Sequence, residues 1–205
     1  LCAAAAYLMD LGLGPAGLAS PDGIFVGRRR LEPAGADYWN QCQRLLMNRD
    51  IQSMVAGVGP RTVLDDGLPY DRCLVGVVTD LDGWETLADH DIHGADAMPR
   101  VLRTQVDVVL PQGACVLNAD DPAVAALSAH CDGDCYWYGQ AVPAGMRGTR
   151  LARWDGQGVC LIDQGLPEGL QARAQMTAFG DHPAAGLSPT LIAAGLERFD
   201  GISRA

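Results

Sequence analysis

Two short stretches of the chain are almost continuously apolar, which is typical of strands that are buried on both faces. They run from Cys73 to Val78 and from Ala114 to Leu117, and polar residues follow each of them at once. A third apolar run, residues 51–58, also has the length of a strand. Three other segments carry apolar residues at helical spacing and predict helices. These segments are residues 37–48, 95–109 and 122–129.

The segments before residue 51 extend this alternation of helices and strands. Residues 1–14 are rich in alanine and leucine and end at two glycines, as helices often do. The turn at Pro21, Asp22 and Gly23 predicts a short strand after it. The alternation predicts an α/β fold in which an open, mostly parallel sheet is flanked by helices. Ligands of such sheets bind beyond the carboxyl ends of the strands. We therefore expect Thr79 and Asn118, at the ends of the two buried strands, to come together at one edge of the sheet.

The last third of the chain has a different pattern. Residues 141–178 are rich in glycine and arginine and predict small antiparallel strands, and residues 189–199 predict a closing helix. We therefore expect residues 1–140 to form the α/β core. Residues 141–205 would add a small antiparallel β segment and a closing helix to the same domain.

The charge of the chain argues against nucleic acid as a partner. Its 205 residues carry a net charge of -10, whereas phosphate backbones need a basic face. All 15 cationic residues are arginines, so the chain holds neither the lysine of an ATP phosphate loop nor a Schiff-base lysine. No apolar run is long enough for a membrane span, and no signal peptide is recognisable, which favours a cytoplasmic protein. Because the chain starts at Leu1, it is either a processed product or an excerpt.

The cysteines indicate a reducing compartment. There are seven of them, scattered along the chain, which does not fit a disulfide framework. Cys131 and Cys135 form a lone C-x3-C pair. Because the sequence offers no second ligand pair, we expect these two thiols to pack as small apolar side chains rather than to bind metal.

The polar residues after the second buried strand form a candidate binding motif. Asn118, Asp120 and Asp121 precede Pro122, which opens a predicted helix. An asparagine at such a strand end can pair with the edge of a purine, and an aspartate can accept hydrogen bonds from ribose hydroxyls. The alternative is that Asp120 or Asp121 caps the helix.

A second candidate is the loop at residues 89–94, DHDIHG, where two histidines and two aspartates fall within five residues. This composition suits a divalent metal or acid–base chemistry near neutral pH. The alternative is a surface loop whose histidines bond to nearby carboxylates. Asp65 and Asp66 before Gly67, with Asp71 and Arg72 after it, could form a catalytic pair, but we expect them to be helix-terminal and loop residues. The sequence has no GxSxG, HExxH or GxGxxG motif, so hydrolase, zinc-protease and dinucleotide-binding functions lack support.

Three motifs together resemble one family. They are GLPYDRCLVGVVTD at residues 67–80, DHDIHG at 89–94 and VLNADDP at 116–122. These motifs look like the central domain of Mur-type amide ligases, and in particular the Mur-like domain of cyanophycin synthetases. The resemblance implies a reaction in which ATP phosphorylates a carboxylate and an amine attacks the acyl phosphate. In cyanophycin synthetases, arginine is joined in this way to a poly-aspartate backbone.

The resemblance also implies cofactors, partners and site residues. The cofactors would be ATP and Mg²⁺, and the partners an amino acid or peptide substrate and the rest of a longer polypeptide, with a homo-oligomer left open. Asn118 and either Asp120 or Asp121 would contact adenine and ribose. His90 and Asp80 would be metal ligands.

Departures from the family pattern predict that the chain alone does not turn over. Residues 56–59 read Ala-Gly-Val-Gly where relatives place a glutamate metal ligand. The family's lysine falls near Leu102 and Arg103, and the carboxy-terminal lobe is missing. We therefore expect the chain to act within a longer polypeptide. Two alternatives are a degenerate Mur-like scaffold without catalysis and an unrelated metal-dependent site at His90 and His93.

Overall fold

The computed structural model describes residues 13–35, 37–148 and 150–154, the strands at 159–163 and 173–174, and Cys2, Ala5, Ala6 and Asp10 individually. The helix expected over residues 1–14 lies largely outside these ranges, and the one expected over 189–199 lies wholly outside them. None of the described helices is long and apolar enough to cross a membrane.

The described chain contains ten strands, four α-helices and four short 3-10 helices. The strands are β1 (Ala16–Ser20), β2 (Gly23–Val26), β3 (Arg29–Glu32), β4 (Ser53–Ala56), β5 (Cys73–Val78), β6 (Val109–Asn118), β7 (Asp134–Tyr138), β8 (Arg150–Trp154), β9 (Val159–Asp163) and β10 (Arg173–Ala174). The helices are α2 (Tyr38–Leu46), α3 (Pro60–Asp65), α4 (Met98–Asp107) and α5 (Pro122–Ala126), with η1 (Trp84–Thr86), η2 (Ala88–His90), η3 (Ala95–Ala97) and η4 (Leu127–His130).

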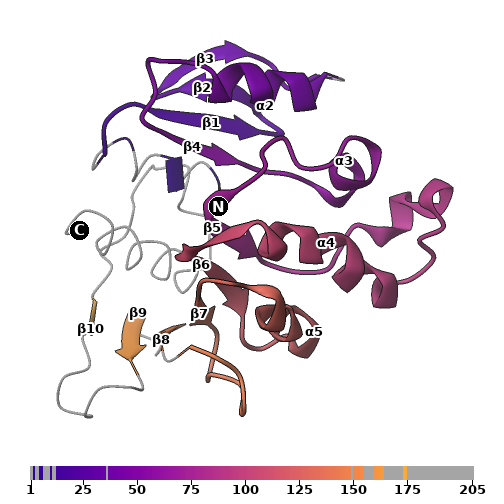
Figure 1. Ribbon diagram of the computed structural model, residues 1–205, viewed down its shortest axis with the longest axis vertical. Helices are drawn as coiled ribbons and strands as arrows, with labels where there is room; N and C mark the ends of the chain where they lie inside the picture. The colour runs from indigo at the N-terminus through magenta and orange to yellow at the C-terminus, as the bar shows by residue number, and fades with distance from the viewer. Residues whose placement is uncertain are drawn as a thin grey trace.

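The larger sheet confirms the predicted α/β class. Its six strands lie in the order β10-β9-β8-β7-β6-β5 (Figure 1), and the four strands from β5 to β8 are parallel. Strands β9 and β10 continue this sheet in antiparallel fashion. The antiparallel strands predicted after residue 140 are therefore present, but β8 itself pairs in parallel with β7 and belongs to the main sheet.

A second, four-stranded sheet was not expected. Its order is β3-β2-β1-β4, with β1 parallel to β4 and antiparallel to β2. The strand predicted over residues 51–58 is therefore part of this sheet and not of the main one. Strand β1 escaped prediction because its sequence, AGLAS, consists mostly of small residues and all five are buried. With no polar face, it shows no two-residue alternation.

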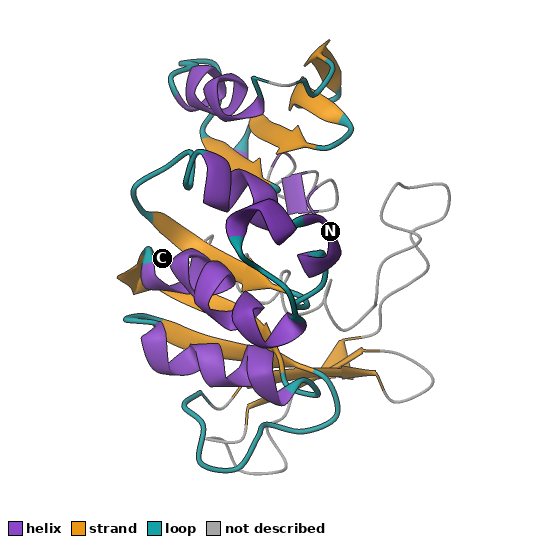
Figure 2. Cartoon of the chain, turned by 90° about the vertical axis from the view of Figure 1, so that its right-hand side faces the viewer, coloured by secondary structure: helices purple, strands orange, loops and turns teal. Residues whose placement is uncertain are grey.

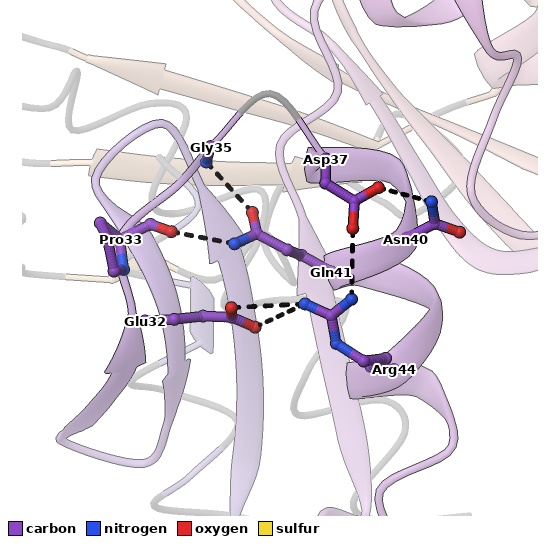
Figure 3. A network of polar contacts seen from close by, with 7 residues as sticks. All are labelled: Glu32, Pro33, Gly35, Asp37, Asn40, Gln41 and Arg44. Carbon is purple, nitrogen blue, oxygen red and sulfur yellow. Dashed lines mark hydrogen bonds and ion pairs between the residues drawn. The ribbon is translucent and has the colours of Figure 1, made fainter.

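Helix α2 covers the smaller sheet and is fastened to it by polar contacts. The Gln41 side chain donates to the carbonyl of Pro33 (3.0 Å) and accepts from the amide of Gly35 (3.2 Å), as Figure 3 shows. The Arg44 guanidinium pairs with Glu32 at 3.0 Å and lowers the pKa of that carboxyl. Because this ion pair is exposed, the helix depends more on its buried apolar face than on the charges.

The two faces of the main sheet carry different apolar clusters, because successive side chains of a strand point to opposite faces. Helices α4 and α5 lie on one side of the sheet (Figure 2). Cys115 and Leu117 of β6 and Trp137 of β7 belong to the cluster that includes residues of these helices. Val116 of β6 and Tyr136 of β7 belong to the cluster on the other face.

The loop between β5 and α4 is held against α3 by charged groups. The Arg61 guanidinium of α3 lies 2.7 Å from the carboxylate of Asp89, and it also donates to the carbonyl of Thr86. The Arg61 hydrogen bond lowers the pKa of Asp89 to about 2. Next to this pair, the ring nitrogen Nε2 of His90 lies 2.6 Å from a carboxylate oxygen of Asp65. The segment with two histidines is thus docked on α3.

Helix α4 approaches β5 at Gly76, and we predict that Gly76→Ala destabilises the fold. A Cβ atom at this position would lie 2.7 Å from the carbonyl oxygen of Gln105 and 2.7 Å from a methyl carbon of Val109. Overpacking of this kind typically costs about 1–3 kcal/mol. Urea unfolding should show this loss. Gly59→Ala is the control, because a Cβ there meets nothing within 4 Å. Equal stability of both variants would contradict the close approach.

The pair of Arg61 and Asp89 gives a second prediction. Because the folded-state pKa of Asp89 is lowered, the stability that it contributes is present above its ordinary pKa of about 3.9 and is lost as the pH falls to about 2. Arg61→Gln should return this pKa toward its ordinary value, as measured by NMR titration of the Asp89 carboxyl carbon. Arg103→Gln, which breaks an ion pair within α4, should leave it unchanged. A pKa that stays near 2 without Arg61 would refute the assignment.

Candidate functional site

The carboxyl ends of β5, β6 and β7 meet at one edge of the main sheet. The register pairs Val78 with Leu117 and Asn118 with Tyr138. Thr79, the residue directly after β5, therefore lies beside Asn118 and Tyr138. The Tyr138 hydroxyl donates to the Thr79 carbonyl at 2.9 Å, and the Asn118 amide approaches the same oxygen at 3.5 Å. The predicted meeting of Thr79 and Asn118 is thus confirmed.

Three carboxylates surround this meeting point. Burial raises the pKa of Tyr138 well above its usual range, and the negative charges of Asp80, Asp121 and Asp120 raise it further. Their electrostatic effect on one phenol shows that the aspartates from the ends of β5 and β6 face a common region. The edge is therefore acidic and rich in oxygen acceptors. It can accept hydrogen bonds from hydroxyl groups or hold a hard cation.

The loop after β6 is ordered by its own side chains. The side-chain oxygen of Asn118 accepts a hydrogen bond from the backbone amide of Asp120 at 3.0 Å. The Asp120 carboxylate accepts one from the backbone amide of Gln140 at 2.8 Å. Gly139 permits this contact, since its φ is +136° and a Cβ there would lie 2.7 Å from the Asp120 carboxylate. These bonds tie the ends of β6 and β7 together. Among the described residues, the nitrogen of the Asn118 carboxamide makes only the long contact to Thr79, so it can donate to a ligand.

Asp121 has the capping role that the sequence left open. One of its carboxylate oxygens accepts the amides of Ala123 (2.9 Å) and Val124 (3.2 Å) at the start of α5, and Pro122 occupies the first helical position. Within the described part of the chain, no backbone amide donates to the other carboxylate oxygen of Asp121. The main role of Asp121 is therefore to cap α5. Asp120 is the more exposed of the two residues.

The two residues expected to hold a metal lie in separate networks. Asp80 is exposed, accepts the Thr79 hydroxyl at 2.7 Å and accepts the amide of Asp82 at 3.1 Å. His90 instead pairs with Asp65, and no ion pair joins His90 to Asp80 among the described residues. Sequence analysis missed this role of Asp65, because the two residues are 25 positions apart and no spacing rule links them.

The positions that depart from the family pattern have ordinary structural roles. Ala56 ends β4, and a Cβ at Gly57 would lie 3.0 Å from the sulfur of Cys2 and 3.6 Å from the carbonyl of Ala19. Arg103 lies on α4 and pairs with Asp107 at 2.9 Å. Among the described residues, neither the glutamate that the family pattern has near residues 56–59 nor the lysine that it has near residue 103 is therefore present.

Sequence comparisons find relatives over part of the chain only. No family model matches it. It is 30% identical over 126 residues to a cyanophycin synthetase from Crocosphaera subtropica, a match that covers 60% of this chain and 14% of that protein. A cyanophycin synthetase from Synechocystis sp. is 32% identical over 116 residues, which are 55% of this chain and 13% of that protein. The matched segment is thus a small part of the relatives' length.

Structural comparisons find two ligases. A UDP-N-acetylmuramoyl-L-alanyl-D-glutamate–2,6-diaminopimelate ligase superposes with a TM-score of 0.61 at 11% identity, over 98% of this chain and 43% of that one. A murein peptide ligase from Psychrobacter arcticus gives a TM-score of 0.50 at 12% identity, over 96% and 41%. At such identity the likeness concerns the fold. The chain is therefore a domain with a Mur-ligase-like fold that resembles a segment of cyanophycin synthetase in sequence.

Proposed function

We propose that this chain is the nucleotide-binding core of an ATP-dependent acid–amino-acid ligase and acts within a longer polypeptide. The observation that carries this proposal is the convergence of Asn118, Asp120 and Asp80 at the carboxyl ends of adjacent parallel strands. Ligands of open α/β sheets bind at this edge. The sequence match to cyanophycin synthetases covers up to 60% of the chain, which supports the ligase class.

In this proposal, the loop after β6 binds the nucleoside. The Asn118 amide donates to the adenine edge, and the Asp120 carboxylate accepts from the ribose hydroxyls. Both side chains are already positioned by the bonds to the Asp120 and Gln140 amides. Such preorganisation lowers the conformational cost of binding. Asp121 contributes mainly by fixing the start of α5, since one of its oxygens is engaged there.

The donor set at the end of β5 fits Mg²⁺, because this ion prefers carboxylate and hydroxyl oxygens. The Asp80 carboxylate would hold it there, next to the Thr79 hydroxyl. When bound, the ion would neutralise charge on phosphate oxygens during phosphoryl transfer. His90 could join as a ligand only by leaving Asp65, which is 2.6 Å away.

For the substrate, we propose that the complete ligase activates a carboxylate as an acyl phosphate, which the amine of an amino acid then attacks. The similarity to cyanophycin synthetases supports arginine as the amine and a poly-aspartate backbone as the carboxylate. The phosphate-loop lysine and the lobe that binds the amino acid would come from other parts of the polypeptide. The chain by itself should then bind ATP weakly and not turn over.

The second candidate is a scaffold domain without nucleotide chemistry. The chain has no lysine at all, and Arg103, near the position of the family's lysine, is engaged with Asp107. On this hypothesis the polar edge would only join β6 to β7 through Asp120 and Gln140. Nucleotide binding by a longer polypeptide separates the two candidates.

Asp120→Asn should weaken nucleotide binding in the polypeptide that contains this chain. The variant keeps a carbonyl oxygen to accept the Gln140 amide, but it loses the charge that would bind the ribose hydroxyls. Since hydrogen bonds to charged groups contribute about 1.5–3 kcal/mol, we expect at least a tenfold rise in the Kd for Mg-ATP, measured by calorimetry. The control is Asp50→Asn, an exposed carboxylate after α2, which should leave the Kd unchanged.

Two results would contradict the proposal. One is the absence of Mg-ATP binding in the longer polypeptide, which would favour the scaffold. The other is an unchanged Kd in Asp120→Asn while the unsubstituted protein binds, which would place the nucleotide elsewhere on the molecule.

A further inference from the structure

Three buried cysteines converge where the amino end of β7 pairs with the middle of β6. Cys115 and Cys135 are direct partners in the parallel pair of β6 and β7, and Cys131 precedes β7. Their exposed fractions are 0%, 4% and 3%, in the order Cys115, Cys135, Cys131. The three sulfur atoms all lie within 4.8 Å of one another, and those of Cys115 and Cys135 are 3.4 Å apart. The strand pairing thus supplies the third thiol that the C-x3-C spacing lacked.

These distances suit a shared metal ion. A zinc–thiolate bond is about 2.3 Å long, so two thiolates on one tetrahedral ion lie about 3.8 Å apart. The sulfurs of Cys115 and Cys135 are slightly closer than this value, and no separation among the three exceeds 4.8 Å. Small rotations of the three side chains would therefore bring all sulfurs to bonding distance, without any change in the pairing of β6 and β7.

A positive charge already lies at the cluster. The Arg147 guanidinium is 3.9 Å from the Cys135 sulfur, and it donates to the carbonyls of Ser128 (3.3 Å) and Cys131. The Cys115 thiol donates to the sulfur of Cys135. These two neighbours lower the pKa of Cys135 to about 7, and the same contact raises that of Cys115. The cluster thus has a guanidinium beside its sulfur atoms.

The other cysteines with resolved shifts behave as ordinary apolar residues. Burial raises the pKa of Cys2 and of Cys42, which lies in α2, and it raises that of Cys73 to about 11. None of the three belongs to a group of three metal-ligating side chains in the described part of the chain. The environment of Cys135 therefore differs from that of a thiol that merely fills a core.

A cavity gives solvent and ions a route to the cluster. It has a volume of about 310 Å³ and is lined by Cys135 itself, by Gly133 and Asp134 at the start of β7, and by Arg147 and Arg150. Because Asp134 begins β7 and Tyr138 ends it, this opening is at the other end of the strand from the polar edge. A ligand here would not compete with one at Asn118.

We propose that Cys115, Cys131 and Cys135 form a three-thiolate site for a thiophilic divalent ion of the zinc class, with Arg147 balancing the remaining charge. Three thiolates and one divalent ion carry a net charge of −1, which the guanidinium offsets. Each S–H bond is replaced by a sulfur–metal bond and its proton passes to solvent, so no oxidant or reductant is needed. A fourth, oxygen ligand can enter from the cavity.

The test is a titration of the reduced full chain with Cd²⁺ in the absence of air. We expect one equivalent to bind, with a thiolate-to-cadmium absorption band and the matching mass increase in native mass spectrometry. Cys131→Ser should lower the affinity at least 100-fold, because it removes a direct ligand. Cys42→Ser, which replaces an equally buried thiol in α2, should leave the affinity unchanged. Circular dichroism should confirm that both variants are folded.

Retention of stoichiometric Cd²⁺ by the folded variant in which Cys115, Cys131 and Cys135 are all serine would overturn the proposal. So would a folded, reduced chain that binds no Cd²⁺, even if later exposure to air joins Cys115 to Cys135 as a disulfide. As a second readout, bound Cd²⁺ should raise the Tm of the unsubstituted chain and of Cys42→Ser, but not that of the triple variant.

Discussion

The parallel register of β5, β6 and β7 is the constraint on which the rest of the structure depends. It places Thr79, Asn118 and Tyr138 side by side, and the Tyr138 hydroxyl fixes the arrangement by donating to the Thr79 carbonyl. Close packing makes the register possible. At Gly76 and Gly113, a Cβ atom would meet backbone oxygens at 2.7 Å and 2.3 Å. A larger residue at Gly113 would push β6 away from β5, and one at Gly76 would push α4 away from the sheet.

The acidity of the carboxyl edge determines which ligands it can accept. Asp80, Asp120 and Asp121 all raise the pKa of Tyr138, so their fields overlap at the edge. A bare polyphosphate would be repelled there, whereas a nucleoside presents hydroxyl and amino groups that these oxygens can bind. The phosphates of a nucleotide would thus extend away from Asp120, and a cation at Asp80 would reduce the repulsion. In the proposed complex, the neutral and the charged parts of ATP would therefore lie at different ends of the polar edge.

The sequence predicted those parts of the fold that have a strong apolar pattern. It located β5, the end of β6 and helices α2 and α4, because their buried residues recur with a clear period or form a continuous run. It missed β1, whose small residues show no alternation, and with it the separate four-stranded sheet. At the site it placed Asn118 beside Thr79, since parallel strands end at one edge. The pairing of His90 with Asp65 and the approach of Cys115 to Cys135 depend on tertiary packing between distant residues, which no local spacing encodes.

The two ends of β7 offer chemically opposite ligands. Its carboxyl end adjoins carboxylate, hydroxyl and amide oxygens, which suit a hard ion such as Mg²⁺. Its amino end adjoins three sulfurs, which suit a soft ion. Because the strand is only five residues long, an ion at the thiols would stiffen the same pairing of β6 and β7 that aligns Asn118 with Tyr138. The order of the polar edge thus depends on packing at the thiols through the shared strands, even though no single side chain belongs to both groups.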